Sequence, residues 1–389
     1  MYEIIYYAVA LVMAGVAAVW AALIRKTVQT LSDTPRLGGG CTGAPLISVI
    51  LPARNEEAFI GRCLDSLLSQ DYPRYEVVAV DDSSEDGTGA IIEGYAGDHG
   101  NVVHVRAGAR PEGWTGKNWA CVEGYRRASG DLLLFTDADT VHLPGSMSAA
   151  AGTLESRRLD ALTVMPRMLA LDFWTRATLP VITVFMHSRF SALNVNDPAK
   201  KTGYFFGSYF MMSREAYEGV GTHEGVRGEM IEDGALGRKT KESGRAMMMV
   251  RGESEVSAVW ARDPRGLWDS LGRLMVPLYL QSRRAAAAIM IAVTMLLVAP
   301  FAALAASAAG GPGWWALAAA AGAASAMVYA GAAIEARRGL GIGAWRAVFA
   351  PLGGAVVVLG FLAGMGGASV AWRGRRYDMR GRSQDSVNI

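Results

Sequence analysis

The chain has 389 residues, of which 51% are hydrophobic and 19% are charged, and its formal net charge is +2. This length exceeds the roughly 100–200 residues of a typical domain, and the composition indicates that part of the chain lies in lipid. The small net charge argues against nucleic acid as a partner. The three scattered cysteines, Cys41, Cys63 and Cys121, are too few for a disulfide framework or a zinc site.

The N-terminal segment is predicted to be a membrane anchor. Residues 4–24 are almost wholly apolar and are followed by Arg25 and Lys26. The run reaches the roughly 20 residues that a spanning helix needs. Because its positive charges follow the apolar core instead of preceding it, we predict a retained anchor at residues 1–26 and not a cleaved signal peptide.

The C-terminal third is also apolar. Residues 285–334 contain no charged side chain and are interrupted by a glycine-rich break at residues 310–313. A further uncharged stretch covers residues 347–372. We therefore predict an interfacial amphipathic segment at residues 263–284, followed by a transmembrane region at residues 285–372.

The side of the membrane on which the chain ends is left open. Arg25 and Lys26 place the domain that follows them in the cytoplasm, by the positive-inside rule, so we expect a multi-pass protein of the cell membrane. Three full spans after that domain would put the C-terminus outside. Either the glycine-rich residues 353–367 re-enter on one side, or one apolar run does not span. The inside is favoured by the arginines of a predicted basic cytoplasmic tail, residues 373–389: Arg373, Arg375, Arg376, Arg380 and Arg382.

The polar middle of the chain, residues 45–262, is predicted to form an α/β domain with a Rossmann-like sheet. Its strands are apolar throughout and are separated by helical patterns, such as the recurrence of Ile60, Leu64 and Leu67. This alternation is typical of a parallel sheet covered by helices on both faces. The predicted strands are residues 46–51, 77–80, 101–105 and 132–135.

Polar residues follow three of these strands at the point where each strand ends. Each cluster alone could be a helix cap or a turn. Independent caps have no reason to fall at the same end of successive strands, whereas ligands of parallel sheets bind beyond the carboxyl ends. The clusters are Pro52, Arg54, Asn55 and Glu56 after the first strand, Asp81 and Asp82 after the second, and Asp137 and Asp139 after the fourth.

Asp137 and Asp139 have a specific chemical use. Mg²⁺ and Mn²⁺ commonly take one or two carboxylates together with phosphate oxygens and water. In a bend, both side chains can face one small volume, one toward a metal and the other toward a sugar or ribose hydroxyl. The D-x-D tripeptide is common by chance, so its position after a strand gives it weight.

Three successive motifs resemble those of the family 2 glycosyltransferases, which use a GT-A fold and a nucleotide-sugar donor. The likeness covers about residues 47–262. Residues 113–120, GWTGKNWA, and the flanking membrane segments resemble the branch associated with hopanoid and carotenoid glycosylation. The resemblance implies a UDP- or GDP-sugar donor, a lipid acceptor and a divalent metal. The motifs are Pro52-x-x-Asn55-Glu56, Val80-Asp81-Asp82-x-Ser84-x-Asp86-Gly87-Thr88 and Asp137-x-Asp139.

The resemblance also implies roles for individual residues on the donor side. Asp139 would bind the Mg²⁺ or Mn²⁺ that bridges the diphosphate, and Asp137 would lie near the ribose or the donor sugar. Lys117 would face the nucleotide, although it could also be a solvated loop lysine. The residues expected to hold the base and ribose are Pro52, Arg54, Asn55, Glu56 and Asp82.

On the acceptor side, Glu232 and Asp233 precede a predicted helix at residues 235–243. The family places its general base in such an E-D element, which assigns Asp233 to that role and Glu232 to acceptor binding. A carboxylate that deprotonates the acceptor hydroxyl typically contributes 10²–10⁴-fold. Alternatively, the two acids could favour the helix N-terminus through its dipole. Residues 203–208 are predicted to form a strand and loop that receive the acceptor through Ser208.

These expectations describe an inverting, metal-dependent glycosyltransferase that makes a single transfer. Processive polysaccharide synthases of the superfamily carry Q-x-x-R-W near their membrane region, and this pentapeptide is absent here. Trp268 and Arg273 could serve a related purpose on an interfacial helix or could anchor it at the membrane surface. The alternatives to single transfer are processive synthesis and a noncatalytic sugar-nucleotide-binding membrane scaffold.

Overall fold

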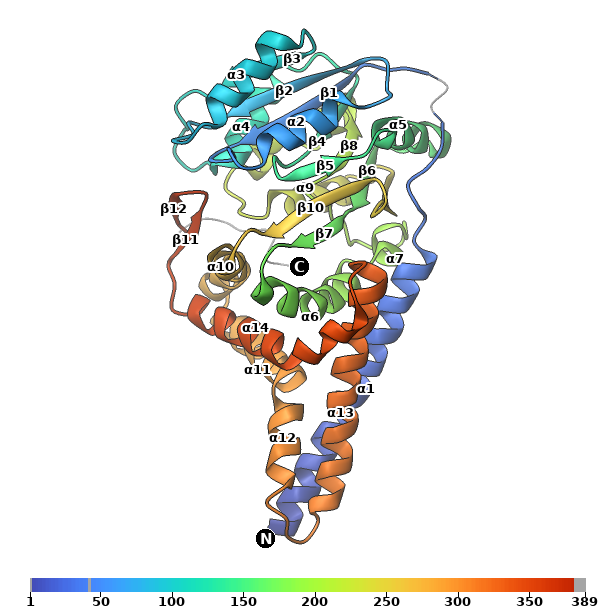
Figure 1. Cartoon of the computed structure of the whole chain (residues 1–389), viewed down its shortest axis with the longest axis vertical. Helices are drawn as coiled ribbons and strands as arrows, with labels where there is room; N and C mark the ends of the chain where they lie inside the picture. Colours follow the sequence, from blue (N-terminus) through green and yellow to red (C-terminus); the bar gives the residue numbers. More distant parts are fainter. Residues whose placement is uncertain (1, 41–42, 381–389) are drawn as a thin grey trace.

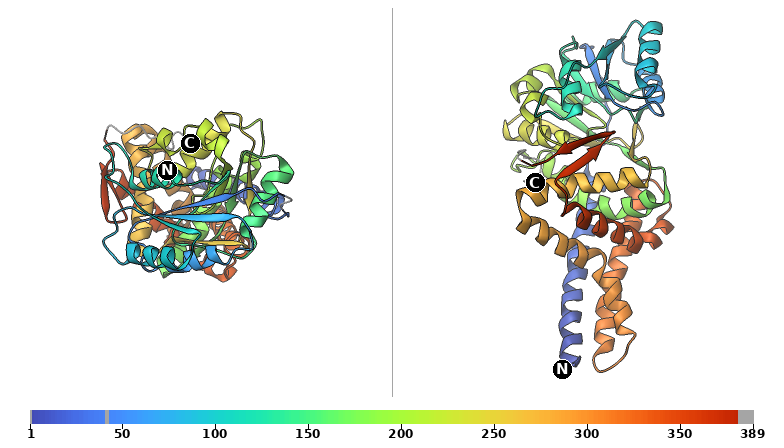
Figure 2. Two further views of the ribbon diagram at one scale, coloured as in Figure 1. Left: turned by 90° about the horizontal axis from the view of Figure 1, so that it is seen from above. Right: turned by 90° about the vertical axis from the view of Figure 1, so that its left-hand side faces the viewer.

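The computed structural model describes residues 2–40 and 43–380, so Cys41 and Arg382 lie outside the described residues. The molecule has two parts (Figure 1). An α/β domain forms the wide part, and a narrow stem of helices extends from it, with α1 (Tyr2–Asp33) running along the stem. A layer of helices lies where the two parts meet (Figure 2).

The α/β domain is built on a seven-stranded sheet with the strand order β3-β2-β1-β4-β8-β6-β9. Strands β1 to β4 run parallel, whereas β8 is antiparallel to both of its neighbours. The central strands are buried on both faces, as their unbroken apolar runs require. The strands are β1 (Ile47–Ala53), β2 (Tyr75–Asp81), β3 (Val102–Arg106), β4 (Leu132–Phe135), β6 (Ala161–Met165), β8 (Phe210–Ser213) and β9 (Met247–Arg251).

Helices cover both faces of this sheet. In α2, Ile60, Leu64 and Leu67 are fully buried, because their spacing places them on one side of the helix. One apolar core lies between α2 and the sheet, and a second core, around Phe135 and Phe210, lies on the other face. The predicted α/β class is confirmed. The helices of the domain are α2 (Ile60–Leu68), α3 (Thr88–Asp98), α4 (Gly116–Tyr125), α5 (Ser146–Arg157), α8 (Arg214–Gly219), α9 (Glu232–Glu242) and the short η1 (His223–Val226).

A second sheet of three strands lies below the first, in the order β5-β10-β7, with bounds Thr140–His142, Val256–Ala261 and Arg167–Ala170. The strand predicted within residues 203–208 is wrong, because this segment has no strand and β8 begins at Phe210. Gly203 lies against the backbone of Gly237, and this close approach holds the segment against α9.

Three helices are long and apolar enough to cross a membrane: Glu3–Asp33, Trp314–Gly339 and Ala344–Gly364. A fourth crossing would combine α11 and α12, which meet at a 48° bend. In the stem, α1 packs along α13, and the fully buried Trp20 donates its Nε1–H to the Leu296 carbonyl at 2.9 Å. The helices below the α/β domain are α6 (Phe173–Arg189), α7 (Ala192–Val195), α10 (Pro264–Gln281), α11 (Arg283–Leu297), α12 (Ala299–Ser307), α13 (Trp314–Ile334), η2 (Glu335–Gly339), η3 (Ala344–Phe349) and α14 (Ala350–Gly364).

Helix α14 lies across the molecule just below the α/β domain, whereas α1, α12 and α13 extend along the stem (Figure 1). It packs on α6 and α10, and Gly353 allows its backbone to approach Ala177 of α6. Both explanations stay open, because Ala344–Gly364 qualifies as a span by length and composition alone. The chain that follows α14 then stays on the side of the α/β domain.

The chain after α14 forms an antiparallel hairpin of β11 (Ser369–Trp372) and β12 (Arg375–Asp378). Its two-residue turn is Arg373-Gly374, and both residues have positive φ, +47° and +78°. Such turns match the twist of a hairpin. The sequence predicts a basic tail from Arg373 onward, whereas Arg373 and Arg375 are carried by this hairpin to the α/β domain (Figure 2).

Candidate active site

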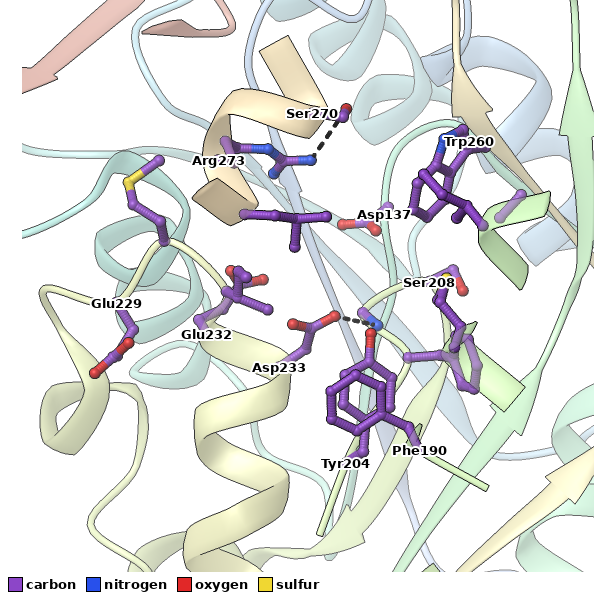
Figure 3. Close-up of a pocket in the computed structure, with 18 of the residues that line it drawn as sticks. Asp137, Phe190, Tyr204, Ser208, Glu229, Glu232, Asp233, Trp260, Ser270 and Arg273 are labelled. Carbon is purple, nitrogen blue, oxygen red and sulfur yellow. Dashed lines mark hydrogen bonds between the residues drawn. The ribbon is translucent and has the colours of Figure 1, made fainter. Parts of the chain in front are cut away.

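A cavity of about 1480 Å³ opens at the carboxyl ends of β1, β2 and β4 and extends down to the helices below the domain. Figure 3 shows part of it, with Asp233, Glu232 and Arg273 around one space. The lining includes all but one of the site residues predicted from the sequence: Pro52, Arg54, Glu56, Asp82, Lys117, Asp137, Asp139, Ser208, Glu232 and Asp233. The exception is Asn55.

Hydrogen bonds join the loop after β1 to the loop after β2. Arg54 donates from Nη1 to the Asp82 carbonyl at 2.8 Å and from Nη2 to Glu85 Oε1 at 2.8 Å. Asn55, which has a positive φ of 53°, accepts from the Glu85 N–H at 2.9 Å. The Glu56 N–H donates to Thr88 Oγ1 at 2.7 Å. Asn55 therefore shapes the loop and does not line the cavity.

Three buried carboxylates, those of Glu56, Asp82 and Asp139, are paired with arginines that the sequence did not assign to the site. Arg373 contacts Glu56 Oε1 at 3.1 Å and Asp139 Oδ2 at 2.9 Å. Arg262, which directly follows β10, lies 3.3 Å from Asp139 Oδ2 and also pairs with Glu56. Arg375 of the hairpin pairs with Asp82. The carboxylates of all three strand ends therefore face a cation.

Burial is the largest influence on the pKa values of these three acids. It raises the pKa of Glu56 to about 7, although Arg373 and Arg262 oppose the shift. Burial likewise raises the pKa of Asp139, against the effect of Arg373, and the pKa of Asp82, against that of Arg375. Desolvated carboxylates have their pKa raised unless a cation compensates. This part of the cavity therefore favours positive charge.

Lys117 links the donor-side acids to the acceptor-side acids. Its Nζ lies 2.7 Å from Asp137 Oδ1 and 2.6 Å from Glu232 Oε1. Burial alone would lower the pKa of Lys117, but Asp137 and Glu232 hold it well above its usual value. It sits in the first turn of α4, which Thr115 caps by accepting from the Asn118 N–H at 3.3 Å. The alternative of a solvated loop lysine is therefore wrong, and the role of Lys117 toward the nucleotide stays a prediction.

Asp233 lies in the first turn of α9, next to Glu232, as helix-dipole arguments favour. Its Oδ2 accepts from the Gly207 N–H at 2.9 Å, and its Oδ1 accepts from the Gly234 N–H at 2.8 Å. Burial and the charge of Glu232 raise the pKa of Asp233 to about 7, with Lys117 opposing them. Asp233 lies at the start of a helix and also lines the cavity. A favourable interaction with the helix dipole therefore does not exclude a chemical role for this carboxylate.

Gly207 stands where a side chain would not fit. A Cβ there would lie 2.9 Å from Asp233 Oδ2 and 3.1 Å from Lys117 Nζ. The next residue, Ser208, lines the cavity, and its backbone carbonyl accepts from Thr136 Oγ1 at 2.8 Å. The stacked rings of Phe190 and Tyr204, 4.3 Å apart, stand below Asp233 (Figure 3).

Arg273 of α10 also lines this cavity. Its guanidinium lies 3.4 Å from the ring centre of Trp372, and burial lowers the pKa of Arg273 to about 10. Trp268, by contrast, is 43% exposed. Of the two residues left open by the sequence, only Arg273 therefore lines the cavity, and Trp268 is an exposed residue of the same helix, α10.

The lower part of the cavity is apolar. Its lining comes from three of the helices below the α/β domain: Ile182 and Met186 of α6, Ile289 and Val293 of α11, and Phe361 of α14. Helices α11 and α14 both belong to segments that qualify as membrane spans by length and composition. One continuous space therefore joins charged strand ends to surfaces suited to lipid.

Comparisons with known proteins agree with this architecture. Residues 48–221 match the model of Glycosyl transferase family 2. The 4,4'-diaponeurosporenoate glycosyltransferase of Staphylococcus aureus (strain MRSA252) is 29% identical over 197 residues, which are 49% of this chain and 50% of that protein. The chain thus spans about half the length of the curated relatives it matches.

A solved structure matches nearly the whole chain. It is the mannosyltransferase PcManGT from Pyrobaculum calidifontis in complex with GDP-Man and Mn²⁺, and it aligns over 91% of this chain and 99% of its own, with a TM-score of 0.54 and 21% identity. At this identity the likeness supports the fold. The fold class predicted from the motifs is confirmed, and residues 48–221 match the family that the motifs resemble.

Proposed function

We propose that this protein, which belongs to glycosyl transferase family 2 through residues 48–221, is a membrane-bound glycosyltransferase. It transfers a sugar from a nucleotide-sugar donor to a lipid or isoprenoid acceptor, in one step, with inversion and with a divalent metal. The observation that carries the proposal is the single cavity, polar at the strand ends and apolar among the helices. The name of the Staphylococcus relative, a diaponeurosporenoate glycosyltransferase, supports the same class of acceptor.

The donor fits the polar end of the cavity. Pro52, Arg54, Glu56 and Asp82 line the region beyond β1 and β2, where a nucleotide is expected on a parallel sheet. Lys117 carries a positive charge beside Asp137, in reach of a nucleotide phosphate. The base remains open between UDP and GDP; the Pyrobaculum neighbour was solved with GDP-Man.

The residues present fit a divalent cation that arrives with the donor. Among residues 2–40 and 43–380, no group of three or more His, Cys, Asp or Glu side chains could hold a metal ion by itself. Mg²⁺ and Mn²⁺ commonly need only one or two carboxylates when phosphate supplies further oxygens. The buried Asp139 would be the protein ligand, and its present partners are cationic. When bound, the metal neutralises the charge that develops on the departing diphosphate.

Asp233 is proposed as the general base. A base works best when its pKa lies near the operating pH, and burial gives Asp233 a pKa of about 7. The Gly207 N–H fixes one carboxylate oxygen, so the side chain is oriented toward the cavity (Figure 3). Ser208 and Glu232 border the same space and would position the acceptor hydroxyl. One base without an enzyme nucleophile corresponds to inversion.

The cavity supports a membrane arrangement of the chain. An anchor at residues 1–26, a GT-A domain at 45–262, an interfacial segment at 263–284 and a membrane region that begins at residue 285 and ends before the β11–β12 hairpin would hold the cavity at the cytoplasmic surface. Confinement of the acceptor in lipid next to Asp233 raises its effective concentration. Exposed apolar side chains on α1, such as Ile4 and Leu11, support contact with lipid.

The decisive experiment uses the detergent-solubilised full chain, radiolabelled UDP- and GDP-sugars, Mn²⁺ and total membrane lipid. We expect label in the organic phase with the unaltered protein and its loss in Asp233→Asn and Asp139→Ala. Glu215→Gln is the matched control, because Glu215 also lies in the first turn of a helix, α8, and its side chain is 83% exposed. Binding of donors without any transfer to lipid, with Asp233→Asn unchanged, would support the scaffold instead.

A further inference from the structure

The hairpin of β11 and β12 lies outside the region that matches the family model, about 150 residues beyond its end. It nevertheless contacts every strand end of the donor site. Arg373 reaches Glu56 after β1 and Asp139 after β4, and Arg375 reaches Asp82 after β2. Tyr377 accepts a hydrogen bond from the Gly116 N–H at 3.2 Å, at the start of α4.

The hairpin arginines occupy the acids that the donor and the metal are proposed to use. Asp139 Oδ2 has two guanidinium nitrogens within reach, from Arg373 at 2.9 Å and from Arg262 at 3.3 Å. A divalent cation at Asp139 would face the positive charge of Arg373 at close range. The two positive charges repel each other at this distance, so loading of the site favours a new partner for Arg373.

A guanidinium that leaves these acids has a suitable new partner. Arginine binds phosphate oxygens through two parallel N–H groups, with a geometry that matches phosphate as well as carboxylate. The side chain of Arg373 is 23% exposed and lines the cavity, and that of Arg375 is 19% exposed and pairs with Asp82, which also lines it. A diphosphate near Asp139 would therefore lie within reach of both of them.

The hairpin has an anchor that does not depend on these ion pairs. Val370, Tyr377 and Met379 are buried against Met230 and Val276, in an apolar cluster of their own. A two-stranded hairpin is only marginally stable alone, so this cluster sets its position. The turn of Arg373 and Gly374 projects from the cluster toward the acids. The arginine side chains can exchange partners while the anchor stays packed.

We propose that the C-terminal hairpin is part of the donor site. Arg373 and Arg375 neutralise Glu56, Asp82 and Asp139 in the donor-free protein, and they move to the donor diphosphate when nucleotide and metal bind. The inference rests on the proposed function, because it assumes a diphosphate donor. It assigns two donor-binding residues, of which Arg373 releases Asp139 for the cation only when the diphosphate is present. Metal and nucleotide therefore promote each other's binding.

The test measures Mn²⁺ binding by electron paramagnetic resonance and nucleotide binding by calorimetry, on the detergent-solubilised full chain. The probes are Mn²⁺ alone, and UDP and GDP at saturating Mn²⁺. We expect Arg373→Ala to bind Mn²⁺ alone about tenfold more tightly, and to bind the nucleotide diphosphate about tenfold or more weakly, since a hydrogen bond to a charged group contributes about that much. Arg375→Ala should weaken only the nucleotide.

Arg376→Ala is the matched control, because it removes the same charge from an exposed position of the same strand. Arg373→Lys keeps the charge without the two-pronged geometry, so it should keep Mn²⁺ binding weak while it still weakens the nucleotide. Affinities for Mn²⁺ and nucleotide that fall together, or that do not change in Arg373→Ala, would overturn the proposal. So would an unaltered protein that binds neither UDP nor GDP. Absence of sugar transfer with intact binding shifts would overturn the proposed function alone.

Discussion

The two ends of the cavity are built in different ways. The donor end is polar, and its acids follow the parallel strands β1, β2 and β4, within residues 47–139. The acceptor end is apolar and is assembled from α6, α11 and α14, which lie far apart in the chain. Charged groups at the donor end are fixed by ion pairs, whereas the side chains that line the acceptor end are mostly apolar. The difference suits a charged donor and a lipid acceptor.

The two ends meet at one row of side chains. Lys117 pairs with Asp137 on the donor side and with Glu232 on the acceptor side, and Asp233 is the next residue in the chain. If the donor and the acceptor bind at opposite ends of the cavity, substitutions in this row of side chains should lower the rate of sugar transfer most strongly. Changes within one end should alter the binding of one substrate and spare the other.

The largest effect is expected for Asp233→Asn, which keeps the shape of the side chain but removes its ability to accept a proton. We expect kcat to fall by about 10²–10⁴-fold, the usual contribution of a general base. UDP and GDP affinity, measured by calorimetry with Mn²⁺, should not change, since Asp233 faces the acceptor end. If nucleotide affinity fell by as large a factor as kcat, the proposal that the donor and the acceptor use separate ends of the cavity would be contradicted.

Gly207→Ala should disturb the same row without changing any charge. Its Cβ would press on Asp233 Oδ2 at 2.9 Å and Lys117 Nζ at 3.1 Å, so both groups must shift. A displacement of about 1 Å in a catalytic group can cost about 10²-fold in rate. We expect a kcat lower by about that factor in the transfer assay, with little change in thermal stability. Gly94→Ala is the control, because its Cβ would meet nothing within 4 Å.

Phe361→Ala tests the acceptor end alone. Phe361 is partly buried and lines the cavity, and full burial of a phenylalanine side chain against an apolar ligand contributes about 1.5–3 kcal/mol, which corresponds to about tenfold or more in affinity. We therefore expect KM for the lipid acceptor to rise about tenfold at unchanged nucleotide affinity. Leu362→Ala is the matched control, because Leu362 is the next residue of α14 and is 56% exposed. Equal effects of the two substitutions would contradict an acceptor path along α14.

Local sequence patterns predicted the donor end well, for a physical reason. Each acid there directly follows its own apolar strand, and a parallel sheet brings such ends together without further information. The strand at residues 132–135 agrees with the observed β4, and Asp137 and Asp139 line the cavity. Their chemical roles stay predictions.

The residues that complete the donor end could not be found in this way. Arg262 and Arg373 meet Asp139 from 123 and 234 positions away, and Arg375 meets Asp82 from 293 positions away. No helical or strand period links positions so far apart; only the tertiary structure does. The turn of Arg373 and Gly374 was the available local signal, because a glycine at such a position is common in tight hairpins.

The smallest predicted effect is the pH dependence of sugar transfer. It is also the most specific test of the row of side chains that contains Lys117, Glu232 and Asp233. Asp233 must be ionised to accept a proton, and burial and Glu232 raise its pKa to about 7. Activity is therefore lost as pH falls through about 7, and between pH 6.5 and 8 kcat should rise about fourfold in a steady-state profile.

Variants of the neighbouring residues sharpen this prediction, because their charges act on Asp233 with opposite sign. Glu232→Gln removes a like charge, so the pKa of Asp233 falls and the profile moves to lower pH. Lys117→Met removes an opposing positive charge, so the profile moves to higher pH. A general base elsewhere in the cavity would not give opposite displacements for these two substitutions. Shifts in opposite directions would thus assign the titration to Asp233, and a profile that neither change moves would assign it to another group.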